Sequence, residues 1–154
     1  MGKEQKLSAS LEDYLEAIYN LSRRSRGARS KDIAEQLEVS RASVTGALRL
    51  LKEKGMIHYE PYDHATLTRA GRVAARDVVT RHDILKSFFL DVLDLPAEVA
   101  QQAACRAEHA LGPNVIAQFL AFVEFVGRGN EDGYRLTDDF RDFCAERAKR
   151  GETV

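Results

Sequence analysis

The chain has 154 residues, of which 44% are hydrophobic and 31% charged. This balance suits a globular protein of one or two small domains and excludes disordered and collagen-like chains. No apolar run approaches the roughly 20 residues that a membrane-spanning helix needs, and the polar start MGKEQK does not resemble a signal peptide. The two cysteines, Cys105 and Cys144, lie in unlike surroundings, which argues against a disulfide framework. We therefore expect a cytoplasmic protein.

The net charge of −1 conceals an uneven distribution of charge along the chain. Residues 1–76 carry 14 Lys or Arg against 10 Asp or Glu, whereas residues 77–154 carry 9 against 14. Basic side chains gather within residues 23–31 and 41–54, so the first half can present a positive surface to phosphates. A run of charge is more often only a solvated face, and this pattern alone does not establish nucleic-acid binding.

The first predicted helix covers residues 11–22, in which apolar side chains recur at helical spacing. Ser8 or Ser10 is available as its N-cap. The polar face of this helix carries Asp13 and Glu16, one turn apart.

Two further helices are predicted across a short turn. Ser30 is expected to cap a helix over residues 31–37, and Ser40 is expected to cap a longer one over residues 41–54. Residues 38–39 make the turn between them. Two helices separated in this way have the form of a helix-turn-helix.

After Gly55 the spacing of apolar residues changes from helical to alternating. Residues 56–60 and 65–68 are predicted to be two short strands, and residues 61–64, which include a proline, are predicted to be the turn between them. The hairpin that they form would be the wing of a winged helix.

Helices are expected over most of the second half, at residues 69–93, 96–111, 114–126 and 136–150, with a polar loop from residue 127 to 133. The helix over residues 114–126 is apolar nearly all round. A single subunit of this size would have difficulty covering such a helix, so we interpret it as the interface of a two-fold dimer. The alternative is a central core helix.

These elements predict a mostly α protein. Residues 1–72 would form an N-terminal winged helix-turn-helix domain that binds DNA. Residues 73–154 would form an all-helical dimerisation domain with a charged C-terminal tail.

The start of the second helix of a helix-turn-helix enters the major groove and contacts base edges. The residues in this position are Ser40, Arg41, Ala42, Ser43 and Thr45. Arg49 and Lys52 would contact the phosphate backbone, as would the wing tip around His64. The alternative is a packed three-helix unit that binds no nucleic acid.

A thiol, a carboxylate and an imidazole lie at positions i, i+3 and i+4 of a predicted helix, namely Cys105, Glu108 and His109. This spacing places the three side chains on one face. The combination suits a first-row divalent ion such as Mn²⁺, Fe²⁺, Co²⁺ or Zn²⁺. The Cys-x-x-Cys motif of a zinc knuckle is absent from the sequence.

Three further candidate ligands lie elsewhere in the sequence. Asp13 and Glu16 precede the helix-turn-helix, and His82 lies in the long helix that follows the wing. Each is individually unspecific, because helix carboxylates are usually solvated and a single histidine is usually structural. Their presence together with a winged helix favours a metal-responsive regulator of transcription.

The chain resembles the family of metal-dependent bacterial repressors that includes the diphtheria-toxin repressor and the manganese transport regulators. The resemblance covers about residues 7–126 and rests on several motifs in the same order: LEDYLEAIY at residues 11–19, DIA at 32–34, SVT at 43–45, LTRAG at 67–71, RH at 81–82 and the Cys105, Glu108 and His109 cluster. It implies repression of metal-uptake genes by a homodimer loaded with Mn²⁺ or Fe²⁺, one or two ions per subunit, on a palindromic operator. The implied metal ligands are Asp13, Glu16, His82, Cys105, Glu108 and His109.

Two departures from the family pattern affect the implied ligand set. Lys86 and Gln101 stand where the iron-type members have a glutamate and a histidine of a second metal site. Cys105 stands where the short manganese-type members have a carboxylate. The ligand set is therefore a hybrid of the two types.

The implied switch links the two predicted domains. Asp13 and Glu16 belong to the DNA-binding part, and Cys105, Glu108 and His109 belong to the dimerisation part, so a cation held by both sets would tie the two parts together. Two alternatives remain. A winged-helix regulator could sense an organic ligand in its helical part, and a metalloenzyme could use the same cluster, although no nucleophile–base pair or cofactor motif supports an enzyme.

Overall fold

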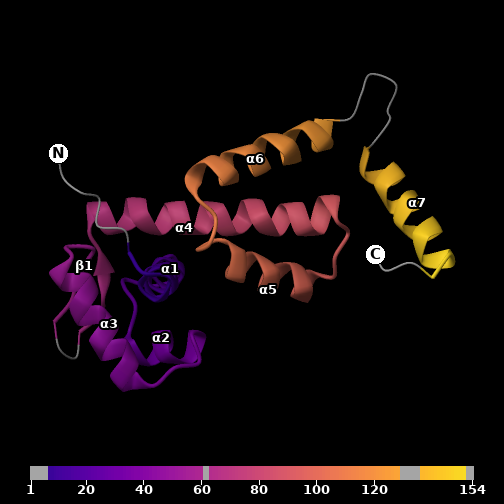
Figure 1. The fold of residues 1–154 in the computed structure, drawn as a ribbon. Coiled ribbons are helices and arrows are strands. Elements are labelled where there is room, and N and C mark those ends of the chain that lie inside the picture. Colours follow the sequence, from indigo (N-terminus) through magenta and orange to yellow (C-terminus); the bar gives the residue numbers. More distant parts are fainter. Residues whose placement is uncertain (1–6, 61–62, 129–135, 152–154) are drawn as a thin grey trace. The chain divides into compact units, whose positions relative to one another are not determined.

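The computed structural model describes residues 7–60, 63–128 and 136–151, and the chain divides into two compact units, residues 1–79 and 80–154 (Figure 1). Helices make up most of both units, with one two-stranded sheet among the described residues. The predicted mostly α fold class is thus confirmed. Within the part of the chain that the structure describes, none of the helices is both long enough and apolar enough to cross a membrane.

The first unit begins with three helices, α1 (Ala9–Ser22), α2 (Ser30–Gln36) and α3 (Arg41–Glu53). The side chain of Ser8 accepts a hydrogen bond from the Leu11 amide at 3.4 Å, and that of Ser40 accepts one from the Ser43 amide at 3.1 Å. Both residues are extended N-caps, as the sequence predicts. The predicted cap at Ser30 is wrong, because Ser30 is already helical and the residue before it is the N-cap, without a side-chain bond.

The turn between α2 and α3 has the predicted helix-turn-helix form. Glu38 adopts a left-handed conformation with φ +54°, and the amide of Val39 donates to the carbonyl oxygen of Ala34 at 3.0 Å. This pattern closes α2 by bonding its last carbonyl groups. Gly55, with φ +70°, lies in the same region of backbone space directly after α3.

The wing is an antiparallel hairpin of β1 (Ile57–His58) and β2 (Thr66–Leu67), which confirms the predicted strands. Residues 61–62 of the predicted turn lie outside the described residues. An isolated bridge joins Ala28 to Ala65 through two backbone hydrogen bonds of 2.9 and 2.8 Å. This bridge attaches the wing to the segment that leads into α2.

Thr68 and Gly71 attach the wing to the helix that follows it. The Thr68 hydroxyl accepts a hydrogen bond from the Gly71 amide at 3.0 Å and donates to the carbonyl oxygen of Gly55 at 2.8 Å. A Cβ atom at Gly71 would lie 1.8 Å from the carbonyl oxygen of Met56. The LTRAG motif is therefore structural here, because its threonine caps a helix and its glycine allows two backbones to meet.

One hydrophobic core holds the first unit together. Its fully buried side chains come from α1, α2, α3 and the wing, and the largest are Leu15, Ile18, Ile33, Val44, Leu48 and Leu51. Burying apolar side chains of this size is worth roughly 1.5–3 kcal/mol each. The core fixes α3 against α1 and α2 and leaves the opposite face of α3 exposed.

The second unit contains the end of α4 (Arg69–Ser87), η1 (Phe88–Val92), α5 (Ala97–Ala107), α6 (Pro113–Arg128) and α7 (Leu136–Lys149). η1 is a π-helical turn in which the Leu93 amide reaches back to the carbonyl oxygen of Phe88 at 3.2 Å. Leu85 of α4, Ala104 of α5 and Ile116 of α6 form a small core. The loop predicted from residue 127 starts later, because α6 continues to Arg128, and the rest of it lies outside the described residues.

α6 presents large apolar side chains to the surface of the single chain. Phe125 is 68% exposed, and Val115, Leu120 and Phe122 are each more than 40% exposed. α6 is therefore not a central core helix of one subunit. An apolar face of this kind is typical of a surface that is covered by another molecule.

Candidate metal centre and DNA-facing surface

The candidate metal ligands of the second unit lie around the end of α5. Cys105 is in the last turn of the helix and is exposed, while Glu108 is its C-cap and His109 follows in the next turn. Glu108 keeps helical dihedral angles, φ −58° and ψ −32°. The three candidate ligands thus lie at and just after the end of α5, with Cys105 exposed and Glu108 buried, and their sharing of one face stays a prediction.

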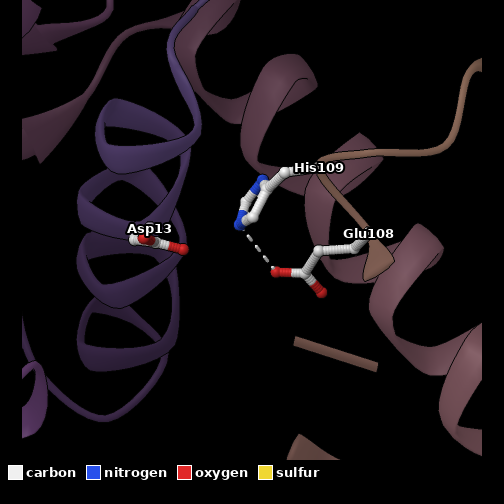
Figure 2. A group of neighbouring side chains, drawn as sticks. All are labelled: Asp13, Glu108 and His109. Atoms are coloured by element: carbon white, nitrogen blue, oxygen red, sulfur yellow. Dashed lines mark ion pairs between the residues drawn. The ribbon is translucent and has the colours of Figure 1, made fainter. Parts of the chain in front are cut away.

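Glu108 is a fully buried carboxylate. Its Oε2 lies 2.7 Å from Nδ1 of His82, and its Oε1 lies 3.2 Å from Nε2 of His109 (Figure 2). Oε1 has no hydrogen bond of good geometry, so this oxygen keeps unused capacity to accept one or to bind a cation. Two imidazoles, one from α4 and one from the turn after α5, therefore flank one carboxylate, the arrangement in which a buried charge is tolerated.

Gln101 extends this arrangement by one residue. Its side-chain nitrogen lies 2.8 Å from Nε2 of His82. An amide nitrogen can only donate, so Nε2 of His82 accepts and its proton is on Nδ1, from which it is donated to Glu108. The sequence analysis noted Gln101 only as a departure from the family pattern. Its position seven residues before Glu108, two turns of helix, was the available signal that both side chains share a face.

The structure brings together His82, Glu108 and His109, and it places Cys105 one turn before them on α5. Asp13 and Glu16 belong to the first unit, where both lie half-buried on α1. A carboxylate with an oxygen left unbonded and an imidazole beside it are donors that first-row divalent ions accept. The residues of the second unit therefore fit a metal ion.

The start of α3 forms an exposed polar surface. Ser40, Arg41, Ala42 and Ser43 are exposed, and Thr45 is half-buried with its hydroxyl donating to the carbonyl oxygen of Arg41 at 2.9 Å. This is the side of α3 that the core leaves exposed. The predicted base-contacting residues thus share an accessible face in the first unit.

Arginines line a hollow next to this surface. Arg41 and Arg49 of α3 and Arg29, which precedes α2, line a hollow of about 590 Å³ whose other side is the wing residue His64. Lys52, in contrast, is paired with Glu60 at 2.6 Å. Arg29 lies in the basic stretch of residues 23–31, and the sequence alone predicts no role for it because its position in the hollow depends on the bridge to the wing.

Two family descriptions match consecutive parts of the sequence. The first, "Iron dependent repressor, N-terminal DNA binding domain", matches residues 6–65, and the second, "Iron dependent repressor, metal binding and dimerisation domain", matches residues 68–133. The chain belongs to this family of metal-dependent transcriptional repressors. The resemblance stated from the motifs is thereby confirmed, and the enzyme alternative is set aside because the related proteins are transcriptional repressors.

Curated relatives of this repressor cover most of its length. It is 34% identical over 143 residues to the transcriptional regulator MntR of Geobacillus kaustophilus, which is 93% of this chain and 97% of the relative. It is 33% identical over 129 residues to MntR of Bacillus subtilis, covering 84% and 88% of the two chains. An HTH-type transcriptional regulator of Methanocaldococcus jannaschii is 33% identical over 119 residues, or 77% of this chain and 95% of the relative.

Solved structures share the fold. A manganese-dependent transcriptional repressor in complex with manganese is similar with a TM-score of 0.66 and 28% identity, over 75% of this chain and 53% of that one. The manganese regulator SloR is similar with a TM-score of 0.67 and 25% identity, over 75% and 54%. This repressor therefore spans about half the length of these two structures.

Proposed function

We propose that this repressor is activated by Mn²⁺ or Fe²⁺, with one or two ions per subunit, and that it controls metal-uptake genes from a palindromic operator. It would act in the cytoplasm, where a DNA-bound repressor has its target. The observation that carries the metal part of the proposal is the buried carboxylate of Glu108, flanked by His82 and His109. The names of the MntR relatives and of the manganese-bound structure support a manganese response.

The proposed ligand set has six members, contributed by both units: Asp13, Glu16, His82, Cys105, Glu108 and His109. His82 can join it only by exchanging a hydrogen bond, because its two ring nitrogens are engaged by Glu108 and Gln101. His109 lies 3.2 Å from the oxygen of Glu108 that has no hydrogen bond of good geometry. We therefore place Glu108 and His109 at the centre of the site and expect His82 to bind last or to act through Glu108.

The switch follows from where the proposed ligands lie in the sequence. Asp13 and Glu16 are on α1, which is part of the core that holds the recognition helix α3. Glu108 and His109 belong to the second unit. A bound cation would supply the countercharge that lets carboxylates from both units share one site, and it would restrict the orientation of the DNA-binding unit. Such coupling is typically worth ~1–3 kcal/mol.

The choice of metal depends on coordination number as well as donor type. Carboxylates favour Mn²⁺, while the thiolate of Cys105 favours softer ions, and Mn²⁺ is the weakest binder of the divalent series. Zn²⁺ is satisfied by four ligands and can bind Cys105, Glu108 and His109 without recruiting Asp13. Mn²⁺ and Fe²⁺ accept about six ligands, so we propose that they activate DNA binding better than Zn²⁺ does.

The proposed DNA contacts follow the exposed face of α3. Arg41 would contact a guanine or a phosphate, and Ser43 and Thr45 would contact bases or phosphates. Lys52 is exposed but paired with Glu60, so binding a phosphate would cost it that ion pair. In the dimer, the exposed apolar face of α6 is the proposed interface.

The decisive experiment measures DNA binding against free metal concentration. Duplexes selected from a random pool supply the operator, and binding is titrated anaerobically with Mn²⁺, Fe²⁺ and Zn²⁺. His109→Ala should abolish the metal response while the protein stays folded and dimeric, whereas His58→Ala, at an exposed histidine of β1, should keep it. DNA binding by the wild type that ignores all three metals would refute the proposal and would favour a repressor that senses an organic ligand.

A further inference from the structure

The hollow beside the recognition helix has an excess of positive charge that the protein itself does not neutralise. Three guanidinium groups line it, those of Arg29, Arg41 and Arg49, against the single carboxylate of Asp63. Within residues 7–60, 63–128 and 136–151, none of the three is in an ion pair. Like charges that converge on one concave surface attract an anion from solution.

Arg29 is held in this hollow by the wing. Its Nε donates a hydrogen bond of 2.9 Å to Nε2 of His64, across 35 residues of sequence. An arginine Nε can only donate, so Nε2 of His64 is the acceptor, which leaves Nδ1 for other partners. Oδ1 of Asp63 lies 3.5 Å from that Nδ1 and also accepts the backbone amide of His64 at 2.7 Å. Asp63 thereby fixes the orientation of the ring that holds Arg29.

The backbone makes this contact possible. The Ala28–Ala65 bridge places the residues before Arg29 and His64 directly opposite each other. Gly27 adjoins the same bridge with φ +156°, and a Cβ atom there would lie 2.8 Å from Cβ of His64. A side chain at position 27 would therefore push His64 away, and glycine keeps the wing close to the α2 segment.

The chemistry of the hollow identifies its occupant. With Nε engaged by His64, the two terminal amino groups of Arg29 still offer four N–H donors in one plane, the geometry that matches phosphate oxygens. The hollow adjoins Arg41 and Thr45 at the start of α3, the part of a helix-turn-helix that lies in the major groove. The anion nearest to such a helix in a complex is a phosphate of the DNA backbone.

We propose that the hollow lined by Arg29, Arg41 and Arg49 seats a backbone phosphate of duplex DNA, and that His64 is the positioning residue that holds Arg29 in it. The inference rests on DNA binding by the first unit and does not depend on the metal centre. Arg29 neutralises the phosphate, whereas His64 removes rotamer freedom from Arg29 before DNA arrives. The two residues therefore differ in their effect on salt dependence.

The test measures binding of the full-length protein to a fluorescein-labelled duplex of mixed sequence over a series of salt concentrations. Arg29→Gln should weaken binding about tenfold at low salt, as expected for loss of a charge-assisted bond, and should reduce the slope of log K against log salt by about 0.9 per protomer. Arg76→Gln, which removes the same charge from an exposed position on α4, should leave the slope unchanged.

His64→Leu should weaken binding about two- to tenfold, the cost of ordering one long side chain, but should keep the slope because Arg29 remains. His64→Gln, which retains an acceptor, should bind like the wild type. The double variant Arg29→Gln with His64→Leu should bind no more weakly than Arg29→Gln alone, because His64 acts only through Arg29. The proposal is overturned if Arg29→Gln leaves the slope intact, if His64→Leu binds like the wild type, or if the two losses add. The series is run with chelator and with Mn²⁺. The same ranking of the variants in both conditions supports the phosphate seat. If the wild type also binds DNA equally well in both conditions, that result counts against the metal proposal alone.

Discussion

Replacing Glu108 by glutamine should change the stability of the protein little without metal and should remove the stabilisation that metal gives to the wild type. The substitution keeps the size of the side chain and removes its charge. In the wild type, two imidazole contacts of 2.7 and 3.2 Å oppose the cost of burying the carboxylate. The 2.7 Å contact is a hydrogen bond to a charged group, worth ~1.5–3 kcal/mol, the 3.2 Å contact adds electrostatic attraction, and burying an ion costs several kcal/mol. The two terms nearly cancel, so with chelator present the variant should be within about 1 kcal/mol of the wild type or more stable.

With metal present, the wild type alone should gain stability. A ligand at 100 times its dissociation constant stabilises the folded state by ~2.7 kcal/mol, and each kcal/mol raises the melting temperature of a chain of this size by ~2–4 °C. Differential scanning calorimetry with Mn²⁺ should therefore show a rise of roughly 5–10 °C for the wild type and almost none for Glu108→Gln. Glu124→Gln, at an exposed carboxylate on α6, is the matched control and should behave like the wild type. A full Mn²⁺-induced rise in Glu108→Gln would remove Glu108 from the metal site.

Three further outcomes are expected. Gly71→Ala should lower the free energy of unfolding, measured in urea, by about 2–4 kcal/mol through overpacking against Met56. Gly46→Ala, in an open position on α3, is the control and should raise this free energy by about 0.5–1 kcal/mol. Equal effects of the two substitutions would contradict the close approach of the backbones at Gly71. Phe125→Asp should convert the dimer to monomer in sedimentation velocity, and an intact dimer would place the interface elsewhere. Cys105→Glu should lower the half-activating concentration of Mn²⁺ relative to Fe²⁺ in DNA-binding titrations, and an unchanged ratio would mean that the thiolate does not select the metal.

The helix-turn-helix could be predicted because its determinants are local in sequence. Ser8 and Ser40 cap their helices through bonds to amides three residues later, and these bonds require only the chain itself. The prediction failed at Ser30 because a distant residue intervenes. Ala65 pairs with Ala28 and extends the backbone there, so the extended N-cap position falls on Arg29.

The interior of the candidate metal centre could be predicted only in part. The spacing of Cys105, Glu108 and His109 is visible in the sequence, and the structure places Glu108 beside His109 and leaves Cys105 exposed. Gln101 and its bond to His82 join α5 to α4 across 19 residues, and no short-range pattern encodes such a pairing. The same is true of the Arg29–His64 contact, which exists because the wing is bridged to the α2 segment.

The contacts of Glu108 indicate how a metal would act on this repressor. Oε2 is bonded to His82, whereas Oε1 lies beside His109 without a hydrogen bond of good geometry, so the second unit satisfies this charge only in part. A cation bound there would compete with the imidazoles, and part of its binding energy would be used to displace them. Under the proposed ligand set the cation would also attract the carboxylates of Asp13 and Glu16 on α1, and metal would then govern how the DNA-binding unit is oriented.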